Sequence, residues 1–317
     1  MSAGQIKRRL RVRLASPRGF CAGVERAIRT VEEALSRYGA PVYVRHEIVH
    51  NAHVVARLKA MGAVFVEDVA EAPADRPIIF SAHGAPRAAH AEAEARAMTM
   101  IDATCPLVQK VHVETRRNVE RGRHVILVGH AGHPEVEGTM GQVPARAVSL
   151  VQTRDDVMRL RPPAGPLAYV TQTTLSVDDT TDIVEALKER FPDIEGPKKA
   201  DICYATSNRQ AAVKKISPGS DLVLVVGSPN SSNSRRLVET AFASGALRAT
   251  LIDGPDDCDP ASLESISVLG LSAGASAPET LVEAVLAKLA AHFDLSVETI
   301  ETTEENIVFK TPMLMAG

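Results

Sequence analysis

The chain has 317 residues, of which 45% are hydrophobic and 24% are charged. This length allows two or three compact units of about 100 residues each and excludes one very small domain. The 36 basic side chains nearly balance the 39 acidic ones, and the formal net charge is -3. The sequence therefore implies no polybasic surface and does not favour nucleic acid as a partner.

The N-terminal stretch MSAGQIKRRLRVRL is basic, but the apolar run that completes a signal peptide does not follow it. The longest clearly apolar run is Leu222–Val226, far shorter than the roughly 20 residues that a membrane helix needs. We therefore expect a cytoplasmic protein that does not enter a membrane.

Short β-rich runs alternate with amphipathic segments from end to end, which is typical of an α/β fold with mostly parallel sheets covered by helices. The first strand is predicted at Arg11–Ala15, and a helical stripe of apolar residues runs from Val24 to Leu35. Further strands are predicted at Val42–Val44, Ile78–Ser81, His124–Val128, Leu167–Thr171, Leu222–Val226 and Ser267–Leu271. Further helices are predicted at Ala52–Met61, Pro106–Arg121, Val177–Arg190, Ser234–Ala243 and Glu279–Phe293.

Three of the four cysteines stand just before a helical pattern: Cys21 in RGFCAGV, Cys105 in DATCPLV and Cys203 in DICYATSNRQ. Their separations, 105 − 21 = 84 and 203 − 105 = 98, each correspond to about one α/β unit. We expect three similar units, residues 1–104, 105–200 and 201–293, and a C-terminal tail, residues 294–317. Units placed around a common axis would bring three helix starts and three thiols to one centre.

A lone cysteine is more often a small buried apolar residue than a ligand, and four widely spaced cysteines do not favour a disulfide framework. The position at a helix start changes this reading, because the helix dipole and free N–H groups stabilise the thiolate, the form that binds metal. Cys258 lies in the acidic turn DDCDP, where neighbouring carboxylates disfavour a thiolate. We assign Cys258 no role.

Histidines give a second signal. His83 and His133 directly follow predicted strands and are flanked by glycines, so they are expected at the carboxyl edge of a parallel sheet, where ligands bind in α/β folds. His50 lies in the cluster RHEIVHNAH, and Glu135 stands close enough to His133 to act as an acid or base. An ordinary surface loop remains the alternative for the HAGHPE segment.

Hydroxyl-rich helix starts give a third signal. The segment GSPNSSNS (227–234) carries Ser231, Ser232 and Asn233, and SAGASAP (272–278) carries Ser276. Ordinary helix capping explains either segment alone, as it does for TQTTLS (171–176), which contains Thr173. Two such helix starts together with histidines form a suitable cradle for phosphate or diphosphate.

Taken together, these segments resemble a known family. The matching segments, in chain order, are PRGFCAGVERA, YVRHEIVHN, SAHGAP, DATCPLV, GHAGHPEVEGTMGQ, TQTTLSVDDT, DICYATSNRQ, GSPNSSNS and SAGASAP, and ENIVF lies near the C-terminus. By these segments the chain is similar to the 4-hydroxy-3-methylbut-2-enyl diphosphate reductases, which act last in the non-mevalonate isoprenoid pathway.

The resemblance implies three α/β units arranged like a trefoil around one [4Fe-4S] cluster, with Cys21, Cys105 and Cys203 as ligands. Three cysteines leave one iron without a protein ligand, and that iron could bind the substrate hydroxyl and pass electrons to it. The products would be isopentenyl and dimethylallyl diphosphate. The two electrons would come from ferredoxin or flavodoxin.

The resemblance also assigns roles to single residues. Glu135 matches the family's proton donor, and Thr173 matches the hydroxyl that helps to relay protons. The residues that would surround the diphosphate, with His133 nearby, are His50, His83, Ser231, Ser232, Asn233 and Ser276.

Two other functions stay open at this point. His130, His133 and a cysteine could form the site of a zinc hydrolase. Alternatively, the cysteines could hold the cluster of a non-enzymatic iron–sulfur redox sensor. A sensor would not need the diphosphate cradle.

Overall fold

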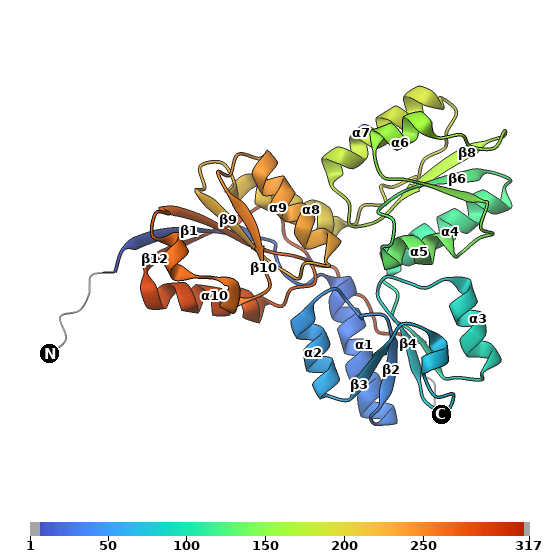
Figure 1. Cartoon of the computed structure of the whole chain (residues 1–317), viewed down its shortest axis with the longest axis horizontal. Helices are drawn as coiled ribbons and strands as arrows, with labels where there is room; N and C mark the ends of the chain where they lie inside the picture. Colours follow the sequence, from blue (N-terminus) through green and yellow to red (C-terminus); the bar gives the residue numbers. More distant parts are fainter. Residues whose placement is uncertain (1–6, 314–317) are drawn as a thin grey trace. The chain divides into compact units, whose positions relative to one another are not determined.

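The computed structural model describes residues 7–313, so the first six residues of the basic N-terminal stretch and the last four of the predicted tail lie outside the described part (Figure 1). Helices and strands alternate and build three parallel sheets, of five, four and three strands. The predicted α/β class is confirmed. The described residues divide into two compact units, the first comprising 7–21, 50–52 and 204–307, and the second comprising 22–49, 53–203 and 308–313.

The first unit contains the five-stranded sheet, with strand order β10-β9-β11-β1-β12. The bounds are β1 Arg9–Ser16, β9 Leu222–Val226, β10 Ala249–Ile252, β11 Val268–Ala273 and β12 Asp294–Glu301. All neighbouring strands are parallel, and β1 pairs with β12 along its full length. The start of the segment predicted as a tail is therefore an edge strand.

Both faces of this sheet are covered because both faces of β9 are apolar. Leu224 and its alternate neighbours pack against α10 (Glu279–His292), whereas Val223 and Val225 pack against α8 (Tyr204–Ile216) and α9 (Ser232–Ala243) (Figure 1). Burial of one such side chain contributes about 1.5–3 kcal/mol. The sheet is thus a rigid base for the loops at its carboxyl edge.

The second unit contains the other two sheets. The four-stranded sheet has the order β3-β2-β4-β5, with β2 Val42–Arg45, β3 Ala63–Val66, β4 Ile78–Phe80 and β5 Met100–Asp102. The helices of this part are α1 Ala22–Tyr38, α2 Ala52–Ala60 and α3 Arg87–Ala95. The three-stranded sheet has the order β7-β6-β8, with β6 His124–Val128, β7 Val148–Val151 and β8 Leu167–Thr171. Its helices are α4 Pro106–Glu120, α5 Pro134–Met140, α6 Arg154–Arg159 and α7 Val177–Arg190.

Alternation again decides the packing of the three-stranded sheet. Ile126 and Val128 pack in a core with residues of α6 and α7, whereas Val125 and Leu127 pack in a core with residues of α4 and α5. Each predicted strand and helix is present, with ends shifted by a few residues. Short 3-10 turns complete the described chain at Val69–Glu71, Pro255–Asp257 and Pro260–Leu263.

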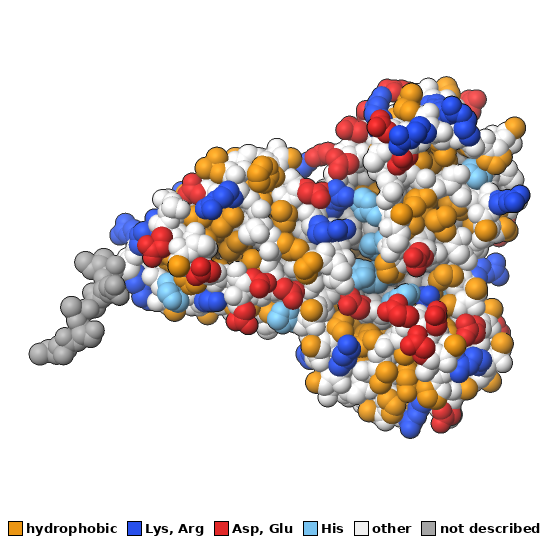
Figure 2. Space-filling model, viewed as in Figure 1, with side chains coloured by type: hydrophobic (Ala, Val, Ile, Leu, Met, Phe, Trp, Pro, Cys, Tyr) orange, Lys and Arg blue, Asp and Glu red, His pale blue; other side chains and the backbone are white. Residues whose placement is uncertain are grey.

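The surface has mixed charge. Acidic and basic side chains are interspersed over both units on the face drawn in Figure 2. Among the helices of residues 7–313, none combines the length and the apolar character needed to cross a bilayer.

Candidate active site

The three candidate ligand cysteines occupy the helix starts that the sequence indicates. Cys21 is followed at once by α1, Cys105 is the N-cap residue of α4, and Cys203 is followed at once by α8. All three thiols are free of disulfides and only partly buried. Their setting is the one that favours a metal-binding thiolate.

The backbone N–H of each of these cysteines makes an equivalent hydrogen bond. Cys21 donates to the Ala275 carbonyl (3.2 Å), Cys105 to the Ala82 carbonyl (3.0 Å) and Cys203 to the Thr173 carbonyl (3.1 Å). Each acceptor lies two residues beyond the end of a strand, namely β11, β4 and β8. The three sheets thus hold their cysteines in the same way, although the sequences around them do not align visibly.

Glycines allow two of these loops their shape. Gly19, in the loop that leads to Cys21, has φ 65°, and Gly84, which follows His83, has φ 81°. A Cβ at Gly84 would lie 2.5 Å from the imidazole of His112. A side chain at either position would therefore strain or displace the loop.

Cys258 differs from the other three cysteines. Its side chain is 3% exposed and belongs to the core beneath the five-stranded sheet. Burial raises the pKa of its thiol, Asp259 adds to the rise, and Lys288 opposes it. The expected effect of a neighbouring carboxylate is present, but burial is the larger cause.

The donor set fits an iron–sulfur cluster better than a disulfide framework, because unbridged thiols at helix starts are the ligands that such clusters use. Cys21 belongs to the first unit, whereas Cys105 and Cys203 belong to the second. Within residues 7–313, no three His, Cys, Asp or Glu side chains are grouped to hold one metal ion. The convergence of the three sulfurs stays a prediction.

The hydroxyl-rich loops of the first unit come together around His50. Ser231 caps α9, and its Oγ accepts a hydrogen bond from the Ser234 N–H at 3.2 Å. The Ser276 Oγ donates to the His50 carbonyl at 2.8 Å and lies 3.5 Å from the Ser231 Oγ. Ser232 is the first residue of α9 and is buried. The two segments that the sequence predicts to form an anion cradle therefore lie together, and anion binding by them stays a prediction.

Asn233 connects this cluster of hydroxyl groups with the Cys21 loop. Its Oδ1 accepts a hydrogen bond from the Ala275 N–H at 2.8 Å. The Ala275 carbonyl in turn accepts a hydrogen bond from the Cys21 N–H. The Asn233 Nδ2 donates to the Thr206 Oγ1 at 3.4 Å. Thr206 is fully buried and was missed by sequence reasoning, although it stands three residues after Cys203.

The histidines of the second unit face each other. The rings of His83 and His133 lie edge to face with their centroids 5.8 Å apart. The His133 Nδ1 accepts a hydrogen bond from the Glu135 N–H at 3.1 Å. In the neutral imidazole this bond leaves the proton on Nε2, which then acts as a donor.

Glu135 and Thr173 form a buried acid–hydroxyl pair. The Thr173 Oγ1 donates to one carboxyl oxygen of Glu135 at 2.9 Å, and the Thr173 N–H donates to the other at 2.6 Å. The two residues are 2% and 4% exposed. Burial raises the pKa of Glu135 to about 7, with a smaller rise from Asp201, although both Thr173 bonds lower it. Such a carboxyl can hold and release a proton near neutral pH.

Asp201 is a further buried residue that sequence reasoning missed. Its carboxylate accepts hydrogen bonds from the Thr171 N–H and from the ammonium group of Lys110, both at 2.9 Å. These bonds tie Asp201, which stands two residues before Cys203, to the end of β8 and to α4. Its place inside the DICYATSNRQ segment was the available signal.

Similar proteins indicate the family of this chain. Residues 12–290 match the family model described as LytB protein. The 4-hydroxy-3-methylbut-2-enyl diphosphate reductase of Hyphomonas neptunium is 58% identical over 97% of this chain and 98% of that protein. The same enzyme of Ruegeria pomeroyi is 60% identical over 95% of this chain and 96% of that protein.

Solved structures agree with this. The E-1-hydroxy-2-methyl-but-2-enyl-4-diphosphate reductase of Plasmodium falciparum matches with a TM-score of 0.91 and 39% identity, over 97% of this chain and 96% of that one. A reductase described as the terminal enzyme of the non-mevalonate pathway matches with a TM-score of 0.63 and 30% identity, over 89% and 99%. Fold and site thus define an α/β oxidoreductase. The chain belongs to the LytB protein family.

Proposed function

We propose that this chain reduces 4-hydroxy-3-methylbut-2-enyl diphosphate to isopentenyl diphosphate and dimethylallyl diphosphate. The reaction consumes two electrons and two protons, breaks the carbon–oxygen bond of the allylic alcohol and releases water. The relatives that carry this description cover nearly the whole chain, and the residues of the candidate site supply the groups that the reaction needs.

Cys21, Cys105 and Cys203 would hold one [4Fe-4S] cluster. Bound there, the cluster would supply the electrons and an iron without a protein ligand, which is suited to binding a hydroxyl oxygen. The thiols are free of disulfides and stand at helix starts, in keeping with this role.

The residues of the first unit would bind the diphosphate. Ser231, Ser276 and Asn233 offer hydroxyl and amide groups at the start of α9 and of the loop after β11, and Ser232 adds a further hydroxyl. A helix N-terminus with such donors favours an anion. His50 belongs to the same cluster, and we expect His83 and His133 to complete the site from the second unit.

The single observation that carries the proposal is the buried Glu135–Thr173 pair. A carboxyl with a pKa of about 7 is protonated in a large fraction of molecules at neutral pH, so it can give its proton to a leaving hydroxyl group. Thr173 donates to the Glu135 carboxyl at 2.9 Å and can relay that proton. Loss of the hydroxyl as water avoids the release of hydroxide.

We expect ferredoxin or flavodoxin to deliver the electrons in the cytoplasm. The test is anaerobic turnover with a reduced donor and 4-hydroxy-3-methylbut-2-enyl diphosphate, with iron, sulfide and zinc measured on the same sample. Consumption of the alcohol with formation of both products supports the proposal. Colourless protein that holds zinc without sulfide would indicate a zinc hydrolase. Protein that holds the cluster but does not turn over substrate would indicate a redox sensor.

A further inference from the structure

Three basic residues occupy similar positions on the helices that follow the candidate cysteines. Arg26 lies on α1, Lys110 on α4 and Arg209 on α8. Counted from the cysteine at the start of each helix, they stand at 26 − 21 = 5, 110 − 105 = 5 and 209 − 203 = 6 residues. Each donates hydrogen bonds to the short backbone segment that precedes another of the three cysteines. We call these segments the lead-in segments; they are residues 19–20 before Cys21, 102–104 before Cys105 and 199–201 before Cys203.

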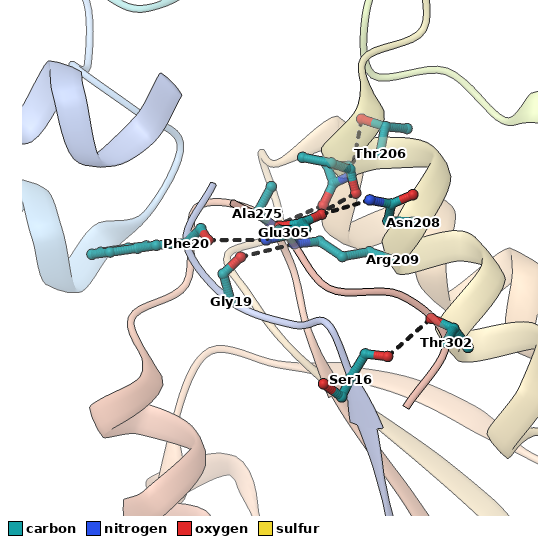
Figure 3. A network of polar contacts seen from close by, with 11 residues as sticks. Ser16, Gly19, Phe20, Thr206, Asn208, Arg209, Ala275, Thr302 and Glu305 are labelled. Atoms are coloured by element: carbon teal, nitrogen blue, oxygen red, sulfur yellow. Dashed lines mark hydrogen bonds and ion pairs between the residues drawn. The ribbon is translucent and has the colours of Figure 1, made fainter. Parts of the chain in front are cut away.

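Arg209 is fully buried and binds the lead-in segment of Cys21 (Figure 3). Its Nε donates to the Gly19 carbonyl at 2.8 Å, and its Nη2 donates to the Phe20 carbonyl at 2.9 Å. The guanidinium charge is balanced by Glu305, at 3.0 Å. The peptides on the N-terminal side of Cys21 are thereby held on a fixed cation.

Arg26 binds the lead-in segment of Cys105. Its Nη1 donates to the carbonyls of Ala103 and Thr104, each at 3.0 Å, and its side chain lies within the protein, with 7% of the residue exposed. Its Nε donates to the Lys310 carbonyl at 2.8 Å. Arg26 and Arg209 therefore each bind a lead-in segment and also a residue near the C-terminus, Lys310 for Arg26 and Glu305 for Arg209.

Lys110 binds the lead-in segment of Cys203. Its ammonium group donates to the Lys199 carbonyl at 2.7 Å, to the Ala200 carbonyl at 3.3 Å and to the Asp201 carboxylate at 2.9 Å. The side chain of Lys110 is 29% exposed, so this contact is the most open of the three.

We propose that Arg26, Lys110 and Arg209 form a cyclic set of positioning residues for the cysteine loops. The helix after Cys21 fixes the lead-in segment of Cys105, the helix after Cys105 fixes that of Cys203, and the helix after Cys203 fixes that of Cys21. The proposal rests on the proposed function in one respect, because it treats the three cysteines as ligands of one cluster.

The physical basis is that hydrogen bonds to a charged donor are shorter and stronger than neutral ones. A carbonyl held by a fixed cation fixes its peptide plane, and with it the direction of the following Cα–Cβ bond. A ligand shell works only when the supporting residues hold each first ligand close to the required geometry. No residue of the cyclic set is proposed to touch substrate.

The test uses the full chain, freed of iron and labelled with 15N only at cysteine, so that its four cysteines give four amide signals. Hydrogen exchange of each amide is measured in Arg209→Met, Arg26→Met and Lys110→Met. The control is Arg190→Met, because Arg190 also donates to two backbone carbonyls, those of Val157 in the last turn of α6 and of Leu160 just after it, in a segment without a cysteine. The Cys258 amide is an internal reference.

We expect each variant to accelerate one amide: Cys21 for Arg209→Met, Cys105 for Arg26→Met and Cys203 for Lys110→Met. Local opening should speed exchange by about tenfold or more for the buried arginines and by less for exposed Lys110. Should Arg209→Met not fold, Arg209→Lys keeps the charge without the fork and should accelerate the Cys21 amide partially. Equal acceleration of all four amides, or of the cysteine at the start of the variant's own helix, overturns the proposal.

A second measurement links this set to the cluster. After anaerobic reconstitution, iron release to a chelator should be faster in the three variants than in Arg190→Met, with Lys110→Met closest to the control. Iron release that is no faster than in Arg190→Met would mean that the three residues position the cysteine loops only in the cluster-free protein. That result would contradict their role in supporting the cluster ligands. Wild-type chain without iron and sulfide would instead refute the cluster, and the amide measurement would still decide the positioning.

Discussion

The loops at Ser231 and Thr173 both follow the end of a parallel strand and both carry hydroxyl groups, yet their partners differ. The Ser231 Oγ accepts from the Ser234 N–H and lies 3.5 Å from the Ser276 Oγ. The Thr173 Oγ1 donates to the carboxyl of buried Glu135. The same position in an α/β unit thus carries a hydroxyl cluster, proposed as an anion cradle, in one unit and a hydroxyl–carboxyl pair, proposed as a proton donor, in the other. The difference is the carboxyl group of Glu135, which contacts the loop at Thr173.

The largest effect that separates the two regions is expected for Glu135→Gln. Glutamine keeps the size of the side chain but has no proton to transfer, so kcat should fall by about 10²–10⁴-fold while KM changes little. Single-turnover and steady-state kinetics with saturating reductant would measure this. Near-normal kcat would show that another group delivers the proton.

The next effect concerns stability and pH. Because the pKa of Glu135 is about 7 in the folded chain and 4.5 ordinarily, the folded state retains a proton that the unfolded state has lost between these values. Its contribution to the free energy of unfolding therefore falls as pH rises through this window, by at most about 3 kcal/mol. Urea unfolding of wild type and Glu135→Gln at several pH values would measure the difference. A difference independent of pH contradicts the raised pKa.

A smaller effect, on binding, is expected for Asn233→Asp. The new carboxylate can still accept from the Ala275 N–H, which the Asn233 Oδ1 does at 2.8 Å, but it places negative charge where the diphosphate is expected. KM should rise by about tenfold or more, with a smaller change in kcat. Asn118→Asp, on α4 in the other unit, is the control for added charge. Equal KM values in both variants would place the diphosphate elsewhere.

The smallest effect tests capping against anion binding. Ser231→Ala removes the N-cap of α9 and should cost about 1 kcal/mol of stability, with a further rise in KM if the hydroxyl binds diphosphate. Ser176→Ala is a matched control, because Ser176 caps α7 with the same 3.2 Å bond. Equal loss of stability with KM unchanged in both variants would reduce Ser231 to a helix cap.

The local pattern of apolar residues predicted many of the strands and helices. The apolar runs at Leu222–Val226 and His124–Val128 gave strands with those bounds, and the cysteines marked three helix starts. Some short or exposed elements were not predicted. Among them are β5, which has three residues, and β12, in which most residues are exposed. Their sequences bury too little apolar surface to show a clear period.

The site was predicted as loops, and its contacts were not predicted from residue pattern. Glu135 and Thr173 are 38 positions apart, and the donors on Arg209 reach carbonyls 190 positions away. Periodicity tells which face of an element is buried, but it does not tell which distant backbone meets a given side chain. The raised pKa of Glu135 could not be foreseen either, because it depends on burial that only the folded chain provides.

The pairing of β1 with β12 has a consequence for the order of synthesis. Arg9 lies beside Asp294, and Ser16, just before the Cys21 loop, lies beside Glu301. During synthesis β1 therefore lacks this neighbour until residues 294–301 have been added, and its other neighbour, β11, begins only at Val268. Such distant pairing forms late in folding. The Cys21 loop therefore gains both neighbours of its strand only after residues 268–301 have been synthesised, and a cofactor bound by that cysteine would be inserted after that point.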